Sequence, residues 1–169
     1  MNIRFPARSA RSARPSRPSR QRGVVTLEFA FMLMLGVLPL LFLTYTGVMM
    51  MAVQQTLATA SAEGARASLR FGTAQQRRVG ACQAAQRSMQ WLLAYAGQTP
   101  DCSNGGSAPI LVSQPTPCVG MADAHCIQVS VSYDYGAHPF LPGTGRLYGW
   151  AMDRPIRSIA VAQLDLGSN

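Results

Sequence analysis

The sequence predicts an α+β protein in which a long N-terminal transmembrane helix leads into a small disulfide-bonded exported head. We expect the head to hold one further helix and a small antiparallel sheet. Three observations predict this: residues 29–53 are uncharged, residues 126–135 alternate apolar and polar side chains, and four cysteines follow the apolar run. An uncharged run of about 20 residues can span a membrane, strict alternation indicates a half-buried strand, and an even set of cysteines indicates disulfides.

The positive charge of the chain is concentrated at its start. All 15 basic residues are arginine, and the formal net charge is +8. Beyond Gly23 the arginines and acids nearly balance, so the charge belongs to a leader and gives no reason to expect a nucleic-acid partner. Basic residues stay on the cytoplasmic side of a membrane helix, so the rest of the chain is expected to be exported. The leader arginines are Arg4, Arg8, Arg11, Arg14, Arg17, Arg20 and Arg22.

Four segments follow from this reasoning. Residues 1–23 are a cytoplasmic leader, 24–53 a transmembrane helix, 54–72 a helical stalk, and 73–169 a periplasmic α+β head. A helix from Val24 to about Arg70 would be roughly 70 Å long, more than the roughly 30 Å hydrocarbon core of a bilayer, so it must emerge from the membrane.

One acidic side chain, Glu28, precedes the apolar run directly. The segment Gly23-Val24-Val25-Thr26-Leu27-Glu28-Phe29 resembles the processing site of type IV pilin-like precursors: a basic leader, Gly, four residues, Glu, and an aromatic residue that opens a long apolar helix. The continuation through Gln54-Gln55 to Glu63-Gly64-Ala65-Arg66-Ala67 resembles the TadE-like family of pseudopilins from tight-adherence (Tad/Flp) pilus systems. The resemblance covers roughly residues 20–70.

The resemblance implies a minor pilin or pseudopilin for a Tad-type pilus, cut between Gly23 and Val24 by a prepilin peptidase, an aspartic protease of the inner membrane. It implies a single-pass protein of the bacterial inner membrane with a periplasmic C-terminal domain, which can enter an extracellular pilus. The implied partners are the peptidase, other Tad pilus subunits, assembly-platform proteins and membrane lipid. Val24 departs from the Phe or Met with which many type IV pilins begin.

The same residues have a physical interpretation without the family. Gly23 lacks a Cβ, so a protease can approach its carbonyl closely. Cleavage would create an amine at Val24, about 6 Å along the helix axis from Glu28. A carboxylate inside a bilayer costs a few kcal/mol, so we expect Glu28 to pair with that amine, in its own or a neighbouring subunit. The alternative is that Glu28 lies near the headgroups and stays hydrated.

A different class of function also fits: an unprocessed single-pass inner-membrane protein whose disulfide-bonded periplasmic domain binds a partner. A cleaved secretory signal ending at Ala58-Thr59-Ala60 fits less well, because its apolar region would exceed the usual 7 to 15 residues or so.

Within the long helix, Gly36 and Pro39 predict a bend. A stripe of small residues follows at multiples of four and predicts close packing, either on another subunit or on the protein's own second helix. The stripe consists of Ala52, Ala60, Gly64 and Ser68.

In the head, apolar periodicity predicts a helix over residues 73–96, which Gly97 ends. Strands are predicted at 110–113, 126–135 and 157–166, the last with Ala160, Ala162, Leu164 and Leu166 inward.

Four cysteines follow the membrane helix: Cys82, Cys102, Cys118 and Cys126. If one straight helix continues to Ala96, Cys82 lies about 21 Å from its end, which disfavours a bond to Cys102. We therefore expect Cys82 to pair with Cys126 and Cys102 with Cys118, and pairing of Cys82 with Cys118 remains open. No Cys-x2-Cys pair is present, so zinc is not expected.

No catalytic motif is recognisable, and neither an enzyme nor a cofactor is expected. His125 and His138, the only histidines, have no carboxylate pair or nucleophile motif beside them. The aromatic residues Trp91, Tyr95, Tyr148 and Trp150 are expected in the core or at an interface.

Overall fold

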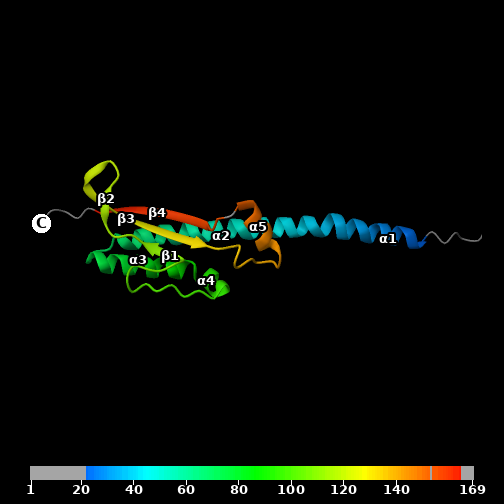
Figure 1. The fold of residues 1–169 in the computed structure, drawn as a ribbon, viewed down its shortest axis with the longest axis horizontal. Coiled ribbons are helices and arrows are strands. Elements are labelled where there is room, and N and C mark those ends of the chain that lie inside the picture. Colours follow the sequence, from blue (N-terminus) through cyan, green and yellow to red (C-terminus); the bar gives the residue numbers. More distant parts are fainter. Residues whose placement is uncertain (1–21, 153, 165–169) are drawn as a thin grey trace, which may run out of the picture. The chain divides into compact units, whose positions relative to one another are not determined.

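The computed structural model describes residues 22–152 and 154–164 (Figure 1). The fold class is α+β, as predicted, and the chain divides into two units, one up to Leu41 and one from Phe42 onward. The helices are α1 (Arg22–Met32), the π-helical turn η1 (Leu33–Val37), α2 (Leu38–Ser68), α3 (Ala74–Ser88), α4 (Gln90–Ala96) and α5 (Thr144–Met152). The strands are β1 (Ile110–Val112), β2 (Thr116–Cys118), β3 (Met121–Tyr133) and β4 (Ile156–Leu164).

The described part of the first unit is helical throughout. At its centre the backbone N–H of Leu38 donates to the carbonyl of Leu33, five residues back, which makes η1 a π-helical turn. Pro39 follows and has no N–H to donate, so the wider turn occurs where the regular hydrogen-bond ladder must lose a member. This π-helical turn contains Gly36 and directly precedes Leu38 and Pro39, where the sequence predicts a bend.

The second unit is built around the C-terminal part of α2 and the two helices that follow it. Thr73 caps α3: its side chain accepts from the N–H of Gln76, whose own side chain accepts from the N–H of Thr73. This reciprocal arrangement satisfies two N–H groups that have no partner within the helix. The predicted helix over 73–96 is interrupted at Met89, where φ is −111° and ψ is 20°, and α4 then ends at Gly97 in the left-handed conformation.

The sheet is antiparallel, with β3 at its centre. β4 pairs with β3 from His125↔Leu164 to Tyr133↔Ile156. β1 and β2 also pair with β3, at different places along its length, and because β4 overlaps both pairings on one edge, they lie on the other. The three predicted strands are confirmed, while β2 and α5 were not predicted from the sequence; Leu166 lies outside the described residues.

The core lies between the sheet and the α2 and α3 helices. Leu57 of α2, Met89 after α3, and Ile127 and Val129 of β3 are all fully buried. Burial of each such side chain contributes roughly 1.5 to 3 kcal/mol. Residues 54–68, assigned to a stalk from the sequence, thus supply part of the head's core.

The disulfide pairing expected from the sequence is wrong. Cys82 pairs with Cys102, and Cys118 with Cys126, with Cα atoms 5.5 Å and 5.1 Å apart. The distance argument assumed one straight helix to Ala96, but the interruption at Met89 removes that premise. The second bridge closes the hairpin between β2 and β3, which the sequence did not reveal.

Candidate functional site

The residues of the expected processing site all lie in α1. Within the described residues α1 begins at Arg22, and the bond between Gly23 and Val24 lies near the start of this described helix. Val24 and Phe29 are both 65% exposed. The bond at which the sequence predicts cleavage is therefore followed by an exposed side chain, that of Val24.

Glu28 is exposed on α1, one helical turn after Val24. Its neighbours on this part of the helix are apolar. Among the described residues the one ion pair joins Arg66 to Glu63, at 2.8 Å, and Glu28 is not part of it.

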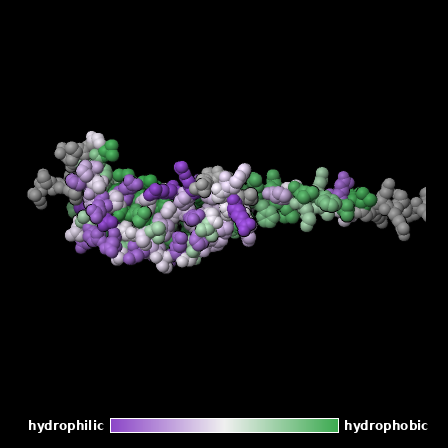
Figure 2. All heavy atoms as spheres, viewed as in Figure 1, coloured by the Kyte–Doolittle hydropathy of each residue, from purple (hydrophilic) through white to green (hydrophobic). Residues whose placement is uncertain are grey.

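The helix around Glu28 is apolar on every side. One helix in the described chain, Val24–Ser68, is long and apolar enough to cross a membrane, and its most apolar part is not buried. Figure 2 shows the hydrophobic side chains of this stretch in green. An apolar surface of this length must be covered by lipid or by other proteins. Residues that expose more than half of their side chains here include Leu27, Phe31, Met34, Leu35, Leu40, Phe42, Leu43 and Val48.

The small-residue stripe is brought together inside the head rather than on its surface. Ala60, Gly64 and Ser68 are buried, and Ala52 is half-buried. A Cβ on Gly64 would lie 2.9 Å from Cγ1 of Val129 and 3.1 Å from the carbonyl oxygen of Ala81. The stripe therefore lets α2 approach the protein's own α3 and β3. The sequence alone left open whether its partner would be another subunit or the protein's own second helix.

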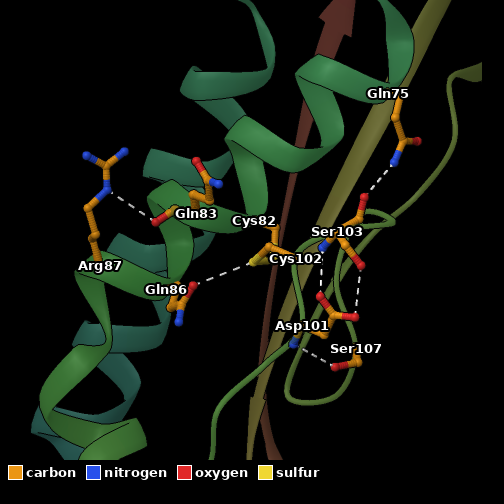
Figure 3. Close-up of a disulfide and its surroundings, with 9 residues drawn as sticks. All are labelled: Gln75, Cys82, Gln83, Gln86, Arg87, Asp101, Cys102, Ser103 and Ser107. Atoms are coloured by element: carbon orange, nitrogen blue, oxygen red, sulfur yellow. Dashed lines mark hydrogen bonds between the residues drawn. A yellow bond between two sulfur atoms is a disulfide. The ribbon is translucent and has the colours of Figure 1, made fainter.

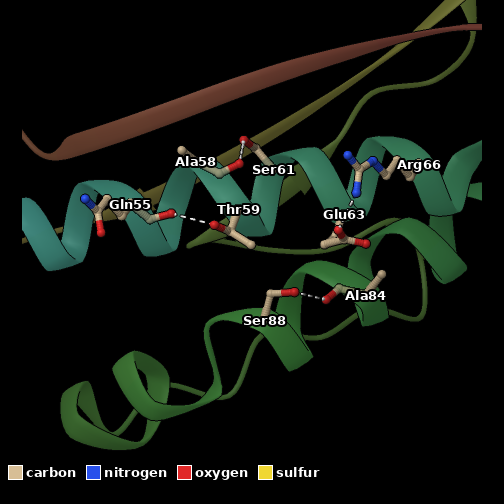
Figure 4. Close-up of polar contacts among 8 residues, drawn as sticks. All are labelled: Gln55, Ala58, Thr59, Ser61, Glu63, Arg66, Ala84 and Ser88. Atoms are coloured by element: carbon tan, nitrogen blue, oxygen red, sulfur yellow. Dashed lines mark hydrogen bonds and ion pairs between the residues drawn. The ribbon is translucent and has the colours of Figure 1, made fainter.

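Polar contacts accompany this packing (Figure 4). The Ser61 hydroxyl lies 3.0 Å from the Ser158 hydroxyl of β4 and also donates to the carbonyl of Ala58. The buried Ser68 hydroxyl donates to the carbonyl of Ala65. No buried side-chain N or O atom in the described residues lacks a hydrogen-bond partner.

The bridge between Cys82 and Cys102 fastens the loop after α4 to α3 (Figure 3). Beside it the Gln75 side chain donates to the carbonyl of Ser103 at 2.9 Å. The N–H and hydroxyl of Ser103 both donate to Asp101, which lowers the pKa of that carboxyl. These contacts give a loop rich in Gly and Ser a defined path.

A shallow groove of about 440 Å³ lies between α2 and α3. Arg66, Arg70 and Arg87 line it, with Glu63 as the acidic residue. Arg66 lies in the last turn of α2 and Arg70 in the turn that follows it, so the two are close in the sequence. The sequence reveals that pair, but not Arg87, which only the packing of α3 brings to the same groove.

Aromatic side chains gather at the end of the sheet where β3 ends and β4 begins. The ring of Phe140 lies 4.7 Å from that of Tyr95 and 6.1 Å from that of Trp91, centroid to centroid. The Tyr133 hydroxyl donates to the carbonyl of His138 at 2.6 Å. Burial, and then the phenols of Tyr95 and Tyr135, raise the pKa of Tyr133 to about 12.

The two histidines lie in different parts of the head. His125 is in β3, opposite Leu164 and Pro117, and His138 is in the loop after β3. Within residues 22–152 and 154–164 no group of three His, Cys, Asp or Glu side chains is placed to hold a metal ion.

Comparison of the chain with protein-family models, with curated proteins and with solved structures gives no match.

Proposed function

We propose that this protein is a TadE-like minor pilin or pseudopilin, inserted in the bacterial inner membrane and used to build a Tad-type pilus. A prepilin peptidase would cut it between Gly23 and Val24. The observation that carries the proposal is the Gly23-x4-Glu28 segment between seven leader arginines and a helix that is apolar on all sides.

The burial pattern of the long helix supports an assembly role. Before Met49 the described helix is almost entirely exposed, and from Val53 onward one of its faces is buried in the head. Lipid can cover the exposed part while the protein is in the membrane. In a filament, matching helices of other subunits can cover it, with close packing in place of lipid contact.

The disulfides and the leader support the proposed orientation. Disulfides form in the periplasm and are rare in the cytosol. Each arginine near an anionic leaflet contributes about 1 kcal/mol of attraction, so the seven would hold residues 1–23 on the cytoplasmic side until cleavage. The head, with its two bridges, would then lie on the periplasmic side.

Cleavage gives Glu28 a function. The cut removes all seven leader arginines and creates one positive amine at Val24. In a helix this amine is about 6 Å along the axis from Glu28, so the carboxylate can pair with it. Pairing with the amine of a neighbouring subunit would also set the axial position of one helix relative to the next.

Intact mass of the product tests the proposal. The chain is expressed with and without its prepilin peptidase, and loss of residues 1–23 is expected only with the peptidase. Gly23→Ala should accumulate as the precursor. Gly36→Ala is the matched control, because it adds the same methyl in open space within η1. Full-length protein in both strains would reject the pilin function and favour an unprocessed membrane protein that binds a partner through its head.

A further inference from the structure

The α5 helix closes the end of the head at which the aromatic residues gather. The Thr144 hydroxyl lies 3.0 Å from the Tyr135 hydroxyl and donates to the carbonyl of Leu141 at the start of the helix. A Cβ on Gly145 would lie 2.7 Å from the carbonyl oxygen of Gly136, so the helix packs tightly on the preceding loop. The Tyr148 ring contacts the Tyr135 ring, at 5.1 Å between centroids.

Two side chains on another face of α5 are exposed in the described part of the chain. Trp150 is 89% exposed, and Arg146 is exposed as well. Residues four apart in a helix are neighbours, so these two side chains share one face, while Tyr148 points the other way into the core. A tryptophan this exposed, with an arginine beside it, has the composition of a membrane-interface anchor.

The position of α5 along α2 follows from the contact between Ser61 and Ser158. β4 begins two residues before Ser158, which is roughly 7 Å along the strand. The same distance along α2 corresponds to four or five residues, so the start of β4 lies at the level of about Leu57. Figure 1 shows β4 and α2 running in the same direction, with α5, which precedes β4, at the level of the part of α2 before Leu57. Met49 and Met50, which are half-buried, begin the part of α2 that the head covers.

The part of α2 at which the head begins coincides with the end of the uncharged run. At 1.5 Å per residue the 25 residues from Phe29 to Val53 rise about 37 Å, some 7 Å more than the hydrocarbon core. With Phe29, next to Glu28, at the cytoplasmic edge of the core, the last turn of the run lies in the headgroup region on the exported side. The head begins at the same turn, which brings α5 to the membrane surface.

We propose that the face of α5 formed by Arg146 and Trp150 binds the lipid headgroup region and fixes the orientation of the head on the membrane. The inference rests on the membrane span in the proposed function, but not on cleavage or on pilus assembly. Trp150 lies between the headgroups and the first methylenes of the acyl chains, and the Arg146 guanidinium lies against lipid phosphates.

The chain has two tryptophans, which makes a direct test simple. Trp91→Phe leaves Trp150 as the one fluorophore and keeps an aromatic ring against Phe140. The full-length variant is reconstituted in phosphatidylcholine and phosphatidylglycerol vesicles with spin-labelled lipid. We expect a label near the headgroup to quench Trp150 more strongly than a label at the chain end, because interfacial tryptophans sit at the headgroup level.

A reporter at the far end of the head is the matched control. Phe71 is fully exposed in the turn after α2. In Trp91→Phe/Trp150→Phe/Phe71→Trp the tryptophan should escape lipid quenching and be quenched by aqueous iodide. Equal lipid quenching at the two positions, or none at Trp150, would overturn the inference. Extraction with alkaline carbonate separates the two proposals. If the protein resists extraction but Trp150 is not quenched, only the binding of α5 to headgroups is rejected. If the protein is extracted, the membrane-spanning helix is rejected as well.

Discussion

Gly64 of α2 lies so close to Val129 of β3 that a Cβ on the glycine would be 2.9 Å from Cγ1 of the valine. The same Cβ would be 3.4 Å from Cβ of Ala85 on α3. Gly64 is therefore the place where helix, helix and sheet meet, and its missing side chain sets the distance between them.

Gly64→Ala should destabilise the head by about 1 to 3 kcal/mol, because the methyl forces the packed elements apart. Chemical unfolding of the full chain in detergent measures this. Gly80→Ala on α3 is the control, since nothing lies within 4 Å of its Cβ position. That change should stabilise the head by roughly 0.5 to 1 kcal/mol through helix propensity. Equal stability of the two variants would contradict the packing role of Gly64.

The two disulfides should differ in their contribution to stability. The bridge between Cys82 and Cys102 spans 20 residues and the bridge between Cys118 and Cys126 spans 8. Loop-closure entropy gives about 3 kcal/mol for the first and about 2.5 kcal/mol for the second. Removal of each pair by alanine, followed by unfolding measurements, should therefore place Cys82→Ala/Cys102→Ala below Cys118→Ala/Cys126→Ala. Non-reducing peptide maps that join Cys82 to any other cysteine would contradict this pairing.

Tyr133 should make the head sensitive to alkali. Its pKa is raised to about 12. The folded state holds the phenolic proton more tightly than the unfolded state does. The stabilisation of the folded state that results is complete below about pH 10 and is lost as the pH rises from about 10 to about 12. Tyr133→Phe should lower stability by about 1 kcal/mol at neutral pH, through loss of the bond to His138, yet flatten the alkaline decline. If stability declines equally at alkaline pH in that variant, the decline arises from groups other than Tyr133.

The sequence predicted those elements whose own residues show an apolar period or an uncharged run. The alternation from Ile127 to Tyr133 and the uncharged run from Phe29 to Val53 each reflect one face or one environment, and both predicted the right element. β2 and α5 have no such signal: β2 is three residues long and contains Pro117, and α5 carries both Gly145 and Gly149. Tertiary contacts, such as that of Thr144 with Tyr135, hold α5 in place.

Features that depend on where the chain changes direction between helices could not be predicted from such local patterns. The disulfide pairing depended on the interruption at Met89, a residue that fits the apolar period of one continuous helix. The basic groove depended on α3 packing beside α2, which brings Arg87 to Arg66 and Arg70. The sequence did show the small residues at Ala60 and Gly64, but their partner is decided by the folded head.

Replacement of Glu28 tests the assembly contact separately from processing. Glu28→Gln keeps the size and polarity of the side chain but removes its charge, so it can no longer form an ion pair with the Val24 amine. We expect cleavage to continue, because the bond after Gly23 is unchanged, and piliation to fall. Intact mass reports the first outcome, and the amount of sheared surface pili reports the second.

The control for this variant is Glu63→Gln, which removes an acid of the head with an exposed partner, Arg66. Exposed ion pairs contribute about 0 to 1 kcal/mol, so this variant should be cleaved and assembled normally. Normal piliation with Glu28→Gln would mean that the carboxylate is merely hydrated at the headgroups. Loss of piliation in both variants would point to a general loss of acidic charge and would contradict a specific pairing of Glu28 with a Val24 amine.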